Sequence, residues 1–311
     1  MVPTINHFIG QQDVIARFKV ALEAAWNDAS RLPHMLFVGG PGLGKTELSH
    51  LAAREMGVAI HERIAQTLQT AGAVNALLLS AEDKEIVFVD EIHELEPHLQ
   101  TTLYRAMEDR QVFVRGRNET THNMPLKDIT ILGATTDEFA LLPPLRDRFK
   151  LVLPFTFYDI EALTKITLQR ATMMGINIST AIAEQVARRS KGTPRLAIRI
   201  LEACHRYSRS QGEPLVTEAH YDATVALEGL DALGLGRDEQ RCLSYLAGRT
   251  EPTRLSTLES ALGIHRRTLQ TVIEPFLVRA GLIERSDKGR EITEEGRRHL
   301  GLTVSKQVET A

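Results

Sequence analysis

Residues 39–46 read Gly39-Gly40-Pro41-Gly42-Leu43-Gly44-Lys45-Thr46, directly after the apolar run Met35-Leu36-Phe37-Val38. They fit the pattern G-x-x-x-x-G-K-S/T, and a helix expected from about Lys45 completes the strand-to-helix setting that the pattern requires. Glycines let successive backbone N–H groups point at phosphate oxygens, and the helix N-terminus adds positive charge. Lys45 would bind the β- and γ-phosphates, and the Thr46 hydroxyl would bind Mg²⁺. The sequence therefore predicts that residues 39–46 bind a nucleotide. The next residue, Glu47, is also predicted to contact the nucleotide.

Two acids end the next apolar run. Residues 86–89 are Ile-Val-Phe-Val, and Asp90 and Glu91 follow at once. Asp90 is predicted to hold Mg²⁺ through water, and Glu91 to orient or deprotonate the water that attacks the γ-phosphate. Two solvated acids at a strand end are the alternative interpretation. His93 is interpreted as structural, because the adjacent acids already cover the chemistry.

Short apolar runs that end in polar groups alternate with helix-period segments in the first half of the chain. A third run, 129–132, ends in Gly-Ala-Thr-Thr at 133–136. The alternation indicates an α/β fold with a parallel sheet and helices on both faces, whose ligand lies at the carboxyl ends of the strands. A hydroxyl of the threonine pair, for which we choose Thr136, could hold the attacking water there.

Two arginines follow this third run. Arg146 and Arg148 flank Asp147 at a junction between a loop and a strand. An arginine supplied to the γ-phosphate of a neighbouring subunit would stabilise the charge of the transition state. A surface salt bridge with Asp147 is an equally good interpretation of the spacing.

The second half of the chain is helical and then ends in a strand pair. Apolar residues at i, i+3 and i+4 predict helices at 159–173, 180–190, 194–209 and 217–228. Beyond Gly236, three more helical stretches precede two strands, 282–284 and 291–293, around a turn at 287–289. Three helices followed by a two-stranded wing are typical of a winged helix-turn-helix.

Basic residues occur at both DNA-facing positions of such a domain. Arg266 and Arg267 open the predicted helix 266–279, whose N-terminus would face phosphate or a groove, while Arg285, Lys288 and Arg290 cluster on the wing. The alternative is a winged helix used only for subunit packing, with solvated arginines.

Composition limits the other classes of function. The net charge of -3 and the 5% aromatic content argue against a purely electrostatic DNA binder and against a stacking platform for single strands. Cys204 and Cys242 form no CxxC pair, so neither a zinc site nor a disulfide framework is predicted, and buried reduced thiols are expected. No secretory signal or membrane-length apolar run is present in the sequence, so we expect a cytoplasmic protein.

Read together, the motifs resemble those of the RuvB family, AAA+ ATPases that drive branch migration of Holliday junctions. The resemblance covers nearly the whole chain. Its motifs are F-I-G-Q at 8–11, G-P-G-L-G-K-T at 40–46, D-E-I-H at 90–93, A-M-E-D at 106–109, G-A-T-T at 133–136, P-L-R-D-R-F at 144–149, G-T-P-R at 192–195, E-P-F-L at 274–277 and G-R at 289–290. The combination of G-A-T-T, P-L-R-D-R-F and G-T-P-R with a winged helix is more specific than the nucleotide motifs alone.

The resemblance implies roles for further residues. Arg148 would be the finger that acts on the ATP of the next subunit, and Arg195 the lid arginine that senses the γ-phosphate in its own subunit. Other residues implied are Phe8, Ile9 and Tyr158 against the adenine, Glu108 and Asp109 near the subunit boundary, and Arg285 and Arg290 on DNA. It also implies an AAA+ ATPase domain at 1–155, a helical lid at 156–232, a winged helix at 233–304 and a tail at 305–311.

Four departures from the family pattern stand out. The N-terminal segment is shorter and lacks an Arg-Pro pair, Asp137 stands where the family carries Arg, and residues 248–252 read G-R-T-E-P instead of G-G-P-V-G. In the family, the segment matching 111–125 is an apolar hairpin that docks on the junction-binding partner RuvA. Here it is shorter and more polar at its tip, so we expect it not to dock on a standard RuvA.

These observations predict an ATPase that uses ATP and Mg²⁺, assembles into a ring, expected to be a hexamer, and translocates duplex DNA at branched junctions. One alternative is a clamp-loader-like or transposition-type switch that binds and releases DNA without long translocation. Another is a DNA-tethered regulator in which nucleotide only sets assembly, although intact Glu91 and Arg148 argue against it. ATPase activity measured with and without duplex would separate the regulator from the two motors.

Overall fold

The structure, a computed structural model, describes residues 4–115 and 121–302. It contains two compact units. The first runs as far as Ile166 and also takes in Gly192–Leu196, and the second comprises Thr167–Lys191 and the chain from Ala197 onward. Predictions on residues 1–3, 116–120 and 303–311, including the hairpin tip and the tail, lie outside the described residues. The division into three domains stays a prediction.

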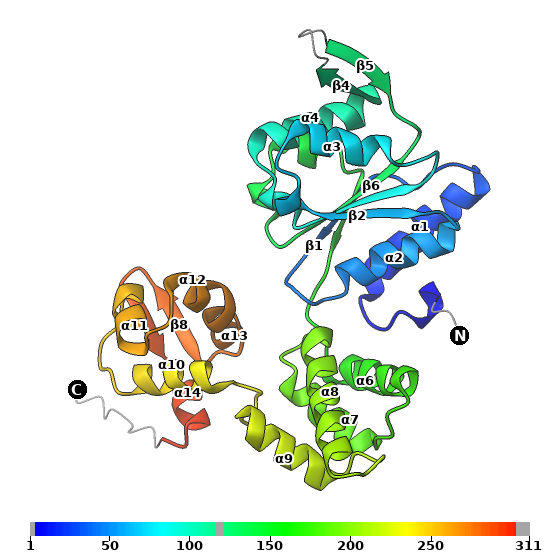
Figure 1. Cartoon of the computed structure of the whole chain (residues 1–311). Coiled ribbons are helices and arrows are strands. Elements are labelled where there is room, and N and C mark those ends of the chain that lie inside the picture. Colours follow the sequence, from blue (N-terminus) through cyan, green and yellow to red (C-terminus); the bar gives the residue numbers. More distant parts are fainter. Residues whose placement is uncertain (1–3, 116–120, 303–311) are drawn as a thin grey trace. The chain divides into compact units, whose positions relative to one another are not determined.

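The first unit is built on a parallel five-stranded sheet, as predicted (Figure 1). Its strand order is β2-β3-β6-β1-β7, with β1 Met35–Val38, β2 Ile60–Ile64, β3 Ile86–Asp90, β6 Thr130–Thr135 and β7 Leu151–Pro154. The three strands expected from apolar runs are the three central ones. The edge strand β2 lacked that signal, because an edge strand is only half covered and tolerates charge, as β2 does with Ile-His-Glu-Arg-Ile. The other edge strand, β7, has the short apolar run Leu-Val-Leu before Pro154, which was not predicted as part of the sheet.

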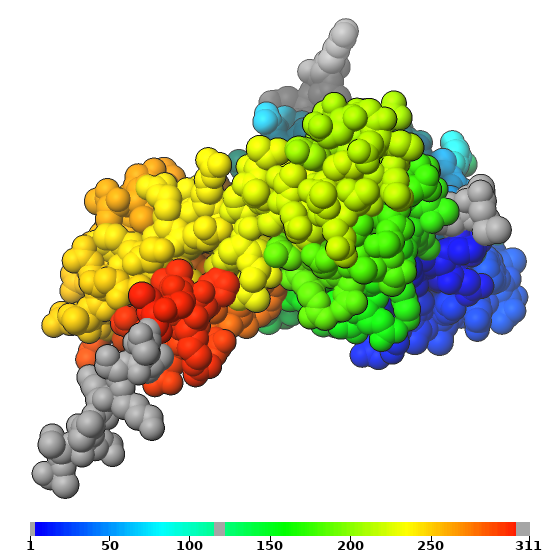
Figure 2. Space-filling view, turned by 90° about the horizontal axis from the view of Figure 1, so that it is seen from below, coloured from blue at the N-terminus to red at the C-terminus, as the bar shows by residue number. Residues whose placement is uncertain are grey.

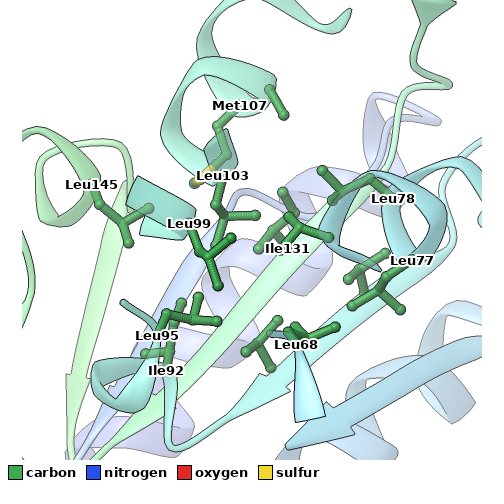
Figure 3. Packing of buried hydrophobic residues seen from close by; sticks show 14 of the residues in the cluster. Leu68, Leu77, Leu78, Ile92, Leu95, Leu99, Leu103, Met107, Ile131 and Leu145 are labelled. Carbon is green, nitrogen blue, oxygen red and sulfur yellow. The ribbon is translucent and has the colours of Figure 1, made fainter. Parts of the chain in front are cut away.

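Helices cover both faces of the sheet. Figure 1 shows α1 (Gln12–Asn27) and α2 (Lys45–Met56) on one face, and α3 (Ala71–Leu79) and α4 (Pro97–Asp109) on the other. In the close-up of Figure 3, Leu77 of α3 and Leu99 of α4 pack toward Ile131 of β6. Each fully buried leucine contributes about 1.5–3 kcal/mol of transfer free energy, so this layer holds the central strands rigidly in place.

Strand β6 is longer than its apolar run predicted. It continues through Gly133 and Ala134 to Thr135, and all three residues are buried. A Cβ placed on Gly133 would lie 3.1–3.2 Å from side-chain carbons of Ile92, Phe149 and Leu36. The glycine therefore continues the strand where neighbouring side chains press closely on its backbone.

The remaining elements of this unit are short. The single turns are η1 Ile5–His7, η2 Ala65–Thr67, η3 Ile92–Glu94, η4 Glu138–Ala140 and α5 Pro143–Arg146, and β4 Gln111–Arg115 pairs with β5 Thr121–Pro125 as an antiparallel hairpin. A hairpin at 111–125 was expected from the family resemblance, and its described strands confirm it.

Four helices follow the sheet along the chain. They are α6 Ile160–Met174, α7 Thr180–Arg189, α8 Pro194–Ser210 and α9 Glu218–Glu228, each within one residue of its predicted ends. Two of them, α6 and α8, contain residues of both units. Side-chain caps explain why the starts of α7 and α9 could be predicted. The hydroxyl of Ser179 accepts a hydrogen bond from the N–H of Ile182, and the hydroxyl of Thr217 accepts one from the N–H of His220.

The winged helix-turn-helix is present in the second unit. It comprises α10 Arg237–Ala247, α11 Leu255–Leu262, α12 Arg266–Thr268, η5 Leu269–Ile273, α13 Glu274–Arg279, β8 Ile283–Ser286, β9 Gly289–Ile292 and α14 Glu294–His299. The single helix predicted over 266–279 is interrupted by the π-helical turn η5, which comes just before Pro275. Proline has no N–H to continue the α-helical pattern, so the backbone bonding changes before it. In Figure 2 the red atoms of α14 lie at the surface, where Glu294 and Arg298 are exposed.

Arg290 lies on the wing strand β9, as the resemblance implied, but its side chain is buried. It is 9% exposed, and its Nε and Nη2 donate to the two carboxylate oxygens of Glu274 at 2.7 and 3.1 Å. Its backbone N–H and carbonyl also bond to Thr253 at 2.9 and 2.8 Å. Because this guanidinium is buried on a carboxylate of α13, Arg290 fixes the wing to that helix, and its predicted contact with DNA gains no support from the structure.

We therefore predict that Arg290→Ala lowers the free energy of unfolding of the winged helix by about 3–5 kcal/mol, because it leaves the Glu274 carboxylate buried without its partner. Arg285→Ala, an exposed change on the same wing, should stay within about 0.5 kcal/mol of wild type. Chemical denaturation of the full chain would measure both. Equal stability of the two variants would show that the Arg290–Glu274 pair has no structural role.

Candidate active site

Three neighbouring strands bring the sequence motifs to one edge of the sheet. Strand β6 pairs with β3 in the register Val89 to Gly133, and with β1 in the register Val38 to Thr135. The N–H of Gly39 then donates to the carbonyl of Thr135 at 3.0 Å. The glycine loop, the acidic pair and the threonine pair thus meet at the carboxyl ends of the strands, where ligands bind in such sheets.

The loop has the backbone that phosphate binding needs. Gly39, Gly42 and Gly44 have φ values of 152°, 76° and 102°, which side chains rarely adopt. A Cβ on Gly39 would lie 2.6 Å from the carbonyl oxygen of Phe155, and one on Gly42 would lie 2.8 Å from the Cβ of Arg195. The glycines are therefore required by both conformation and space, and the loop fits a phosphate chain.

Lys45 is buried in the loop with its ammonium on backbone oxygens. Its Nζ donates to the carbonyls of Gly39 and Gly40 at 2.6 and 3.0 Å. Burial lowers the pKa of Lys45, while the carboxylates of Glu91 and Asp90 act in the opposite direction. The ammonium thus rests on two weak acceptors that phosphate oxygens could replace.

The other residues around Lys45, in the loop and in the first turn of α2, differ in exposure. Thr46 is half-buried at the helix start beside Lys45, whereas Pro41 is exposed and Leu43 is buried in the core. Glu47 is exposed and pairs with Arg54 at 3.2 Å, so its predicted place in the nucleotide site gains no support from this contact.

The acidic pair lies at the end of β3. Asp90 is its last residue, and its Oδ1 accepts the N–H of Glu91 at 3.0 Å. Glu91 has φ 50° and ψ 44°, the left-handed region. For a non-glycine residue this conformation is strained by about 1–3 kcal/mol, and such strain is typical of functional sites.

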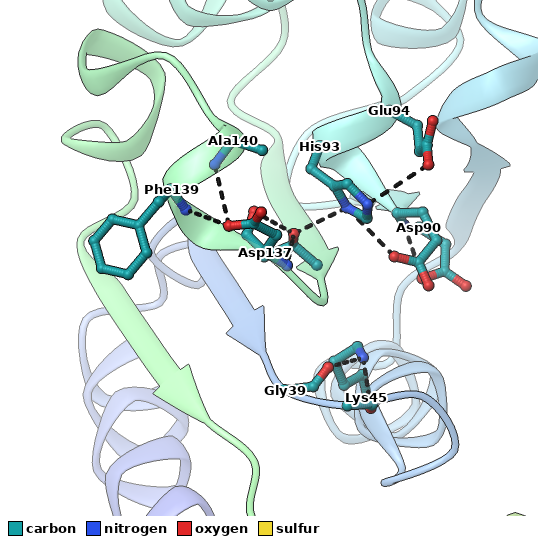
Figure 4. A network of polar contacts seen from close by, with 11 residues as sticks. Gly39, Lys45, Asp90, His93, Glu94, Asp137, Phe139 and Ala140 are labelled. Carbon is teal, nitrogen blue, oxygen red and sulfur yellow. Dashed lines mark hydrogen bonds and ion pairs between the residues drawn. The ribbon is translucent and has the colours of Figure 1, made fainter. Parts of the chain in front are cut away.

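Of the threonine pair, Thr135 is the residue that contacts His93. Thr135 is buried, and its Oγ1 lies 3.0 Å from Nδ1 of His93 and bonds to the backbone N–H and carbonyl of Asp137 at 2.9 Å each (Figure 4). Thr136, chosen from the sequence, is exposed. The spacing of the motif could not separate the two, because only the pleat of the strand decides which hydroxyl points inward.

Arg195 belongs to the first unit together with the rest of Gly192–Leu196. Its N–H donates to the carbonyl of Gly42 at 3.4 Å, and the carbonyl of Gly192 accepts from the N–H of Tyr158 at 2.9 Å. The G-T-P-R segment is therefore bound to the glycine loop by its backbone, and the role implied for the Arg195 side chain stays a prediction.

A cavity of about 450 Å³ lies beside Ile9 and Tyr158. The hydroxyl of Tyr158 donates to the carbonyl of Leu43 at 3.0 Å, and burial raises the pKa of Tyr158 to about 12. A Cβ on Gly44 would lie 3.3 Å from the ring of Phe8. Tyr158 and Phe8, expected at the adenine, thus lie next to the phosphate loop, whereas the residues of that loop do not line the cavity.

Sequence reasoning missed two residues of this region. The Gln11 side chain holds the backbone of Thr156 at both ends of its amide, at 2.6 and 3.0 Å. Phe157 is 46% exposed, and its ring would lie 3.6 Å from a Cβ on Gly40. Gln11 stood within the F-I-G-Q motif, but nothing in the sequence separated Phe157 from an ordinary core aromatic.

Arg148 pairs with Glu108 of α4 and not with its neighbour Asp147. The side chains of Arg148 and Glu108 are 39% and 48% exposed, and Asp109 next to them is exposed. The residues implied for the subunit boundary therefore lie together on the surface of the first unit.

The predicted DNA-facing residues divide into three groups. Arg266 and Arg267 are exposed, but their backbone N–H groups already donate to side chains of Glu259 and His265 at 3.1 and 3.3 Å. The start of α12 therefore offers no open N–H groups to phosphate at these positions. Arg285 and Lys288 are exposed on the wing, and Arg290 is buried.

Other candidate chemistry finds no support among residues 4–115 and 121–302. No group of three or more His, Cys, Asp or Glu side chains in this part of the chain could hold a metal ion by itself. No helix within it has the length and apolarity to cross a membrane. Both cysteines are buried free thiols, as expected, and burial raises the pKa of Cys204 to about 11 and of Cys242 to about 12.

Models of three RuvB domains match the chain in succession. The Holliday junction DNA helicase RuvB P-loop domain matches residues 2–155, the RuvB AAA lid domain 158–231 and the RuvB C-terminal winged helix domain 232–301. Together they span nearly all of the 311 residues.

Individual relatives agree. The Holliday junction branch migration complex subunit RuvB of Rubrobacter xylanophilus is 37% identical over 306 residues, 97% of this chain and 86% of that protein. The Thermotoga maritima RuvB Holliday junction branch migration motor has 34% identity and a TM-score of 0.85, covering 97% of this chain and 98% of that one. The Aeropyrum pernix ORC2 protein, at 15% identity, a TM-score of 0.59 and coverage of 90% and 89%, shares the fold alone. The chain belongs to the RuvB family of P-loop AAA+ proteins.

Proposed function

We propose that this chain is the ATP-hydrolysing subunit of a ring-shaped motor that moves duplex DNA at Holliday junctions. The observation that carries the proposal is the gathering of the phosphate loop, the Asp90–Glu91 pair and Arg195 at one edge of the sheet. The match of residues 232–301 to the RuvB winged helix adds a part suited to holding DNA. The relatives support the junction as substrate, because their names state Holliday junction branch migration.

In this mechanism ATP lies with its β- and γ-phosphates on the glycine loop. The Lys45 ammonium leaves the carbonyls of Gly39 and Gly40 for phosphate oxygens. Thr46 and Asp90 offer the hydroxyl and carboxylate oxygens that suit Mg²⁺, which neutralises phosphate charge when bound. Glu91 takes a proton from water as the water oxygen bonds to the γ-phosphorus and the bond to the ADP oxygen breaks.

The first test uses two variants of this site with a synthetic four-way junction. Lys45→Ala should abolish nucleotide binding, because it removes the positive charge that binds the phosphates. Glu91→Gln should bind ATP yet hydrolyse it about a hundredfold more slowly or worse, because only the proton acceptor is lost. Nucleotide affinity, ATPase rate and strand exchange at the junction would be measured for each.

An ATPase rate of Glu91→Gln close to that of the wild type would contradict this mechanism. ATPase activity that responds to duplex without any movement of the junction would instead favour a switch that binds and releases DNA.

We further propose that Arg148 acts on the ATP of the next subunit in the ring. It lies on the surface with Glu108 and Asp109, which suits a residue that must reach another copy of the chain. An ion pair between two half-exposed side chains contributes only about 0–1 kcal/mol. The guanidinium can therefore leave Glu108 for a γ-phosphate at little cost.

Subunit mixing tests this arrangement. Arg148→Ala subunits should be inactive alone but regain some ATPase activity when mixed with Lys45→Ala subunits, because mixed interfaces place an intact Lys45 opposite an intact Arg148. Light scattering or native mass spectrometry would verify that the variants assemble together. A co-assembled mixture as inactive as either parent would make Arg148 structural.

We propose that the wing holds the DNA backbone through Arg285 and Lys288. Both are exposed, whereas Arg290 is committed to Glu274. Contacts to phosphate fix position without reading sequence, which suits a motor that must pass over any sequence.

Replacing Arg285 and Lys288 by Ala should weaken duplex binding equally on unrelated sequences. The slope of log affinity against log salt should fall by roughly two units, since each phosphate contact contributes about 0.9. ATPase activity without DNA serves as the control and should stay near wild type. Unchanged affinity and salt slope would assign the winged helix to subunit packing.

We propose that the β4–β5 hairpin is not a docking site for a standard RuvA. Val112 is 1% exposed and packs in the core with Val114, so the described strands present Phe113 and Met124 as their large exposed apolar residues. Tight interfaces need a well-packed apolar centre, and two side chains that are each 42% exposed supply little of one. The motor would therefore find its junction directly or through a partner of another surface chemistry.

A further inference from the structure

We infer that His93 is a positioning residue that orients the Glu91 carboxylate and ties it to strand β6 through Thr135. The inference rests on the proposed ATP hydrolysis with Glu91 as proton acceptor, and it replaces the purely structural role that the sequence suggested for His93. The observation behind it is one imidazole nitrogen that faces two partners. Nδ1 of His93 lies 3.0 Å from Oγ1 of Thr135 and 3.4 Å from Oε2 of Glu91 (Figure 4).

The hydrogen on this nitrogen can be assigned from the bonds of Thr135. The hydroxyl of Thr135 donates its single hydrogen to the carbonyl of Asp137 and accepts the N–H of Asp137, both at 2.9 Å. In its contact with His93 it can therefore act only as a further acceptor. Nδ1 of His93 carries the hydrogen and is the donor, so the same N–H faces a hydroxyl and a carboxylate.

The carboxylate of Glu91 needs this donor. Its Oε2 is buried and accepts no hydrogen bond of normal geometry in the described structure. A buried oxygen without a hydrogen bond is unfavourable by about 1–3 kcal/mol, and more when it is charged. A small rotation of the Glu91 side chain or of the imidazole would shorten the 3.4 Å contact to a hydrogen bond.

The ring itself is held on both sides. Its Nε2 lies 3.7 Å from the carboxylate of Glu94, and the His93 side chain is only 17% exposed. Thr135 belongs to the paired strand β6, so its backbone is fixed there, whereas the Glu91 side chain can still rotate toward the imidazole. His93 can therefore pass a displacement at the end of β6 to the orientation of the catalytic carboxylate.

In this arrangement Nδ1 of His93, and not Nε2, contacts both Glu91 and Thr135. Substitutions that keep an N–H near one nitrogen or the other can therefore test the inference. His93→Ala should lower kcat by roughly tenfold to a hundredfold, as expected when a catalytic group is misplaced by about an ångström, with ATP affinity within about twofold of wild type. His93→Asn places an amide N–H near the Nδ1 position and should recover much of kcat. His93→Gln reaches toward the Nε2 position and should not.

A second arm tests the tie to β6. Thr135→Val keeps the shape of the side chain and removes its hydroxyl, so it should also lower kcat at unchanged ATP affinity. The double variant with His93→Ala should lose less than the product of the two single effects, because both act through one contact. Steady-state kinetics, binding of a non-hydrolysable ATP analogue and thermal melts would be run on all variants, with Glu91→Gln as the reference for a lost carboxylate.

Three results would overturn the role of His93: a His93→Ala variant with wild-type kcat, equal rescue by Asn and Gln, or losses in kcat that follow ATP affinity or melting temperature. If His93→Ala does not fold, the comparison of Asn with Gln decides alone. A wild-type protein without ATPase activity would overturn the proposed function itself, whereas an active wild type with a fast His93→Ala variant would overturn only this inference.

Discussion

The pairing of β6 with β3 on one side and β1 on the other is the constraint on which the site depends. Parallel strands end at a common edge, so this pairing brings three loops that are distant in sequence to one place. The close approach is possible because Gly133 has no side chain where Ile92, Phe149 and Leu36 converge. A Cβ at this position would lie 3.1–3.2 Å from those side chains, so they would have to shift to admit it.

Burial distinguishes residues that hold the fold from residues that can act on a ligand. Arg290 is buried with two bonds to Glu274, and releasing it would leave a carboxylate unpaired. Arg148 has a comparable partner in Glu108, but both side chains are about half-exposed, where water replaces a lost partner at little cost. Lys45 is buried like Arg290, yet its partners are neutral carbonyls, so a phosphate is a better acceptor than those it has.

Backbone strain and an unsatisfied polar atom coincide at Glu91. Glu91 combines a left-handed backbone with a buried, unbonded carboxylate oxygen, and both features are unfavourable. The rigid layer of leucines on α3 and α4 behind the sheet supplies the stability that tolerates them (Figure 3). A firm core behind a strained edge is the arrangement expected of a site whose geometry is set before its ligand arrives.

The sequence by itself determined the α/β class, the central strands, the lid helices and the family, because glycine loops, apolar runs and helix periods are local patterns. It also placed Lys45, Asp90 and Glu91, since Lys45 stands between a glycine loop and a helix and the two acids lie at the end of a strand. Only the tertiary structure decided that Thr135 and not Thr136 contacts His93, and that Arg290 and not Arg285 is buried. These choices depend on which neighbour a side chain meets across the sheet or the wing, and spacing along the chain carries no record of such contacts.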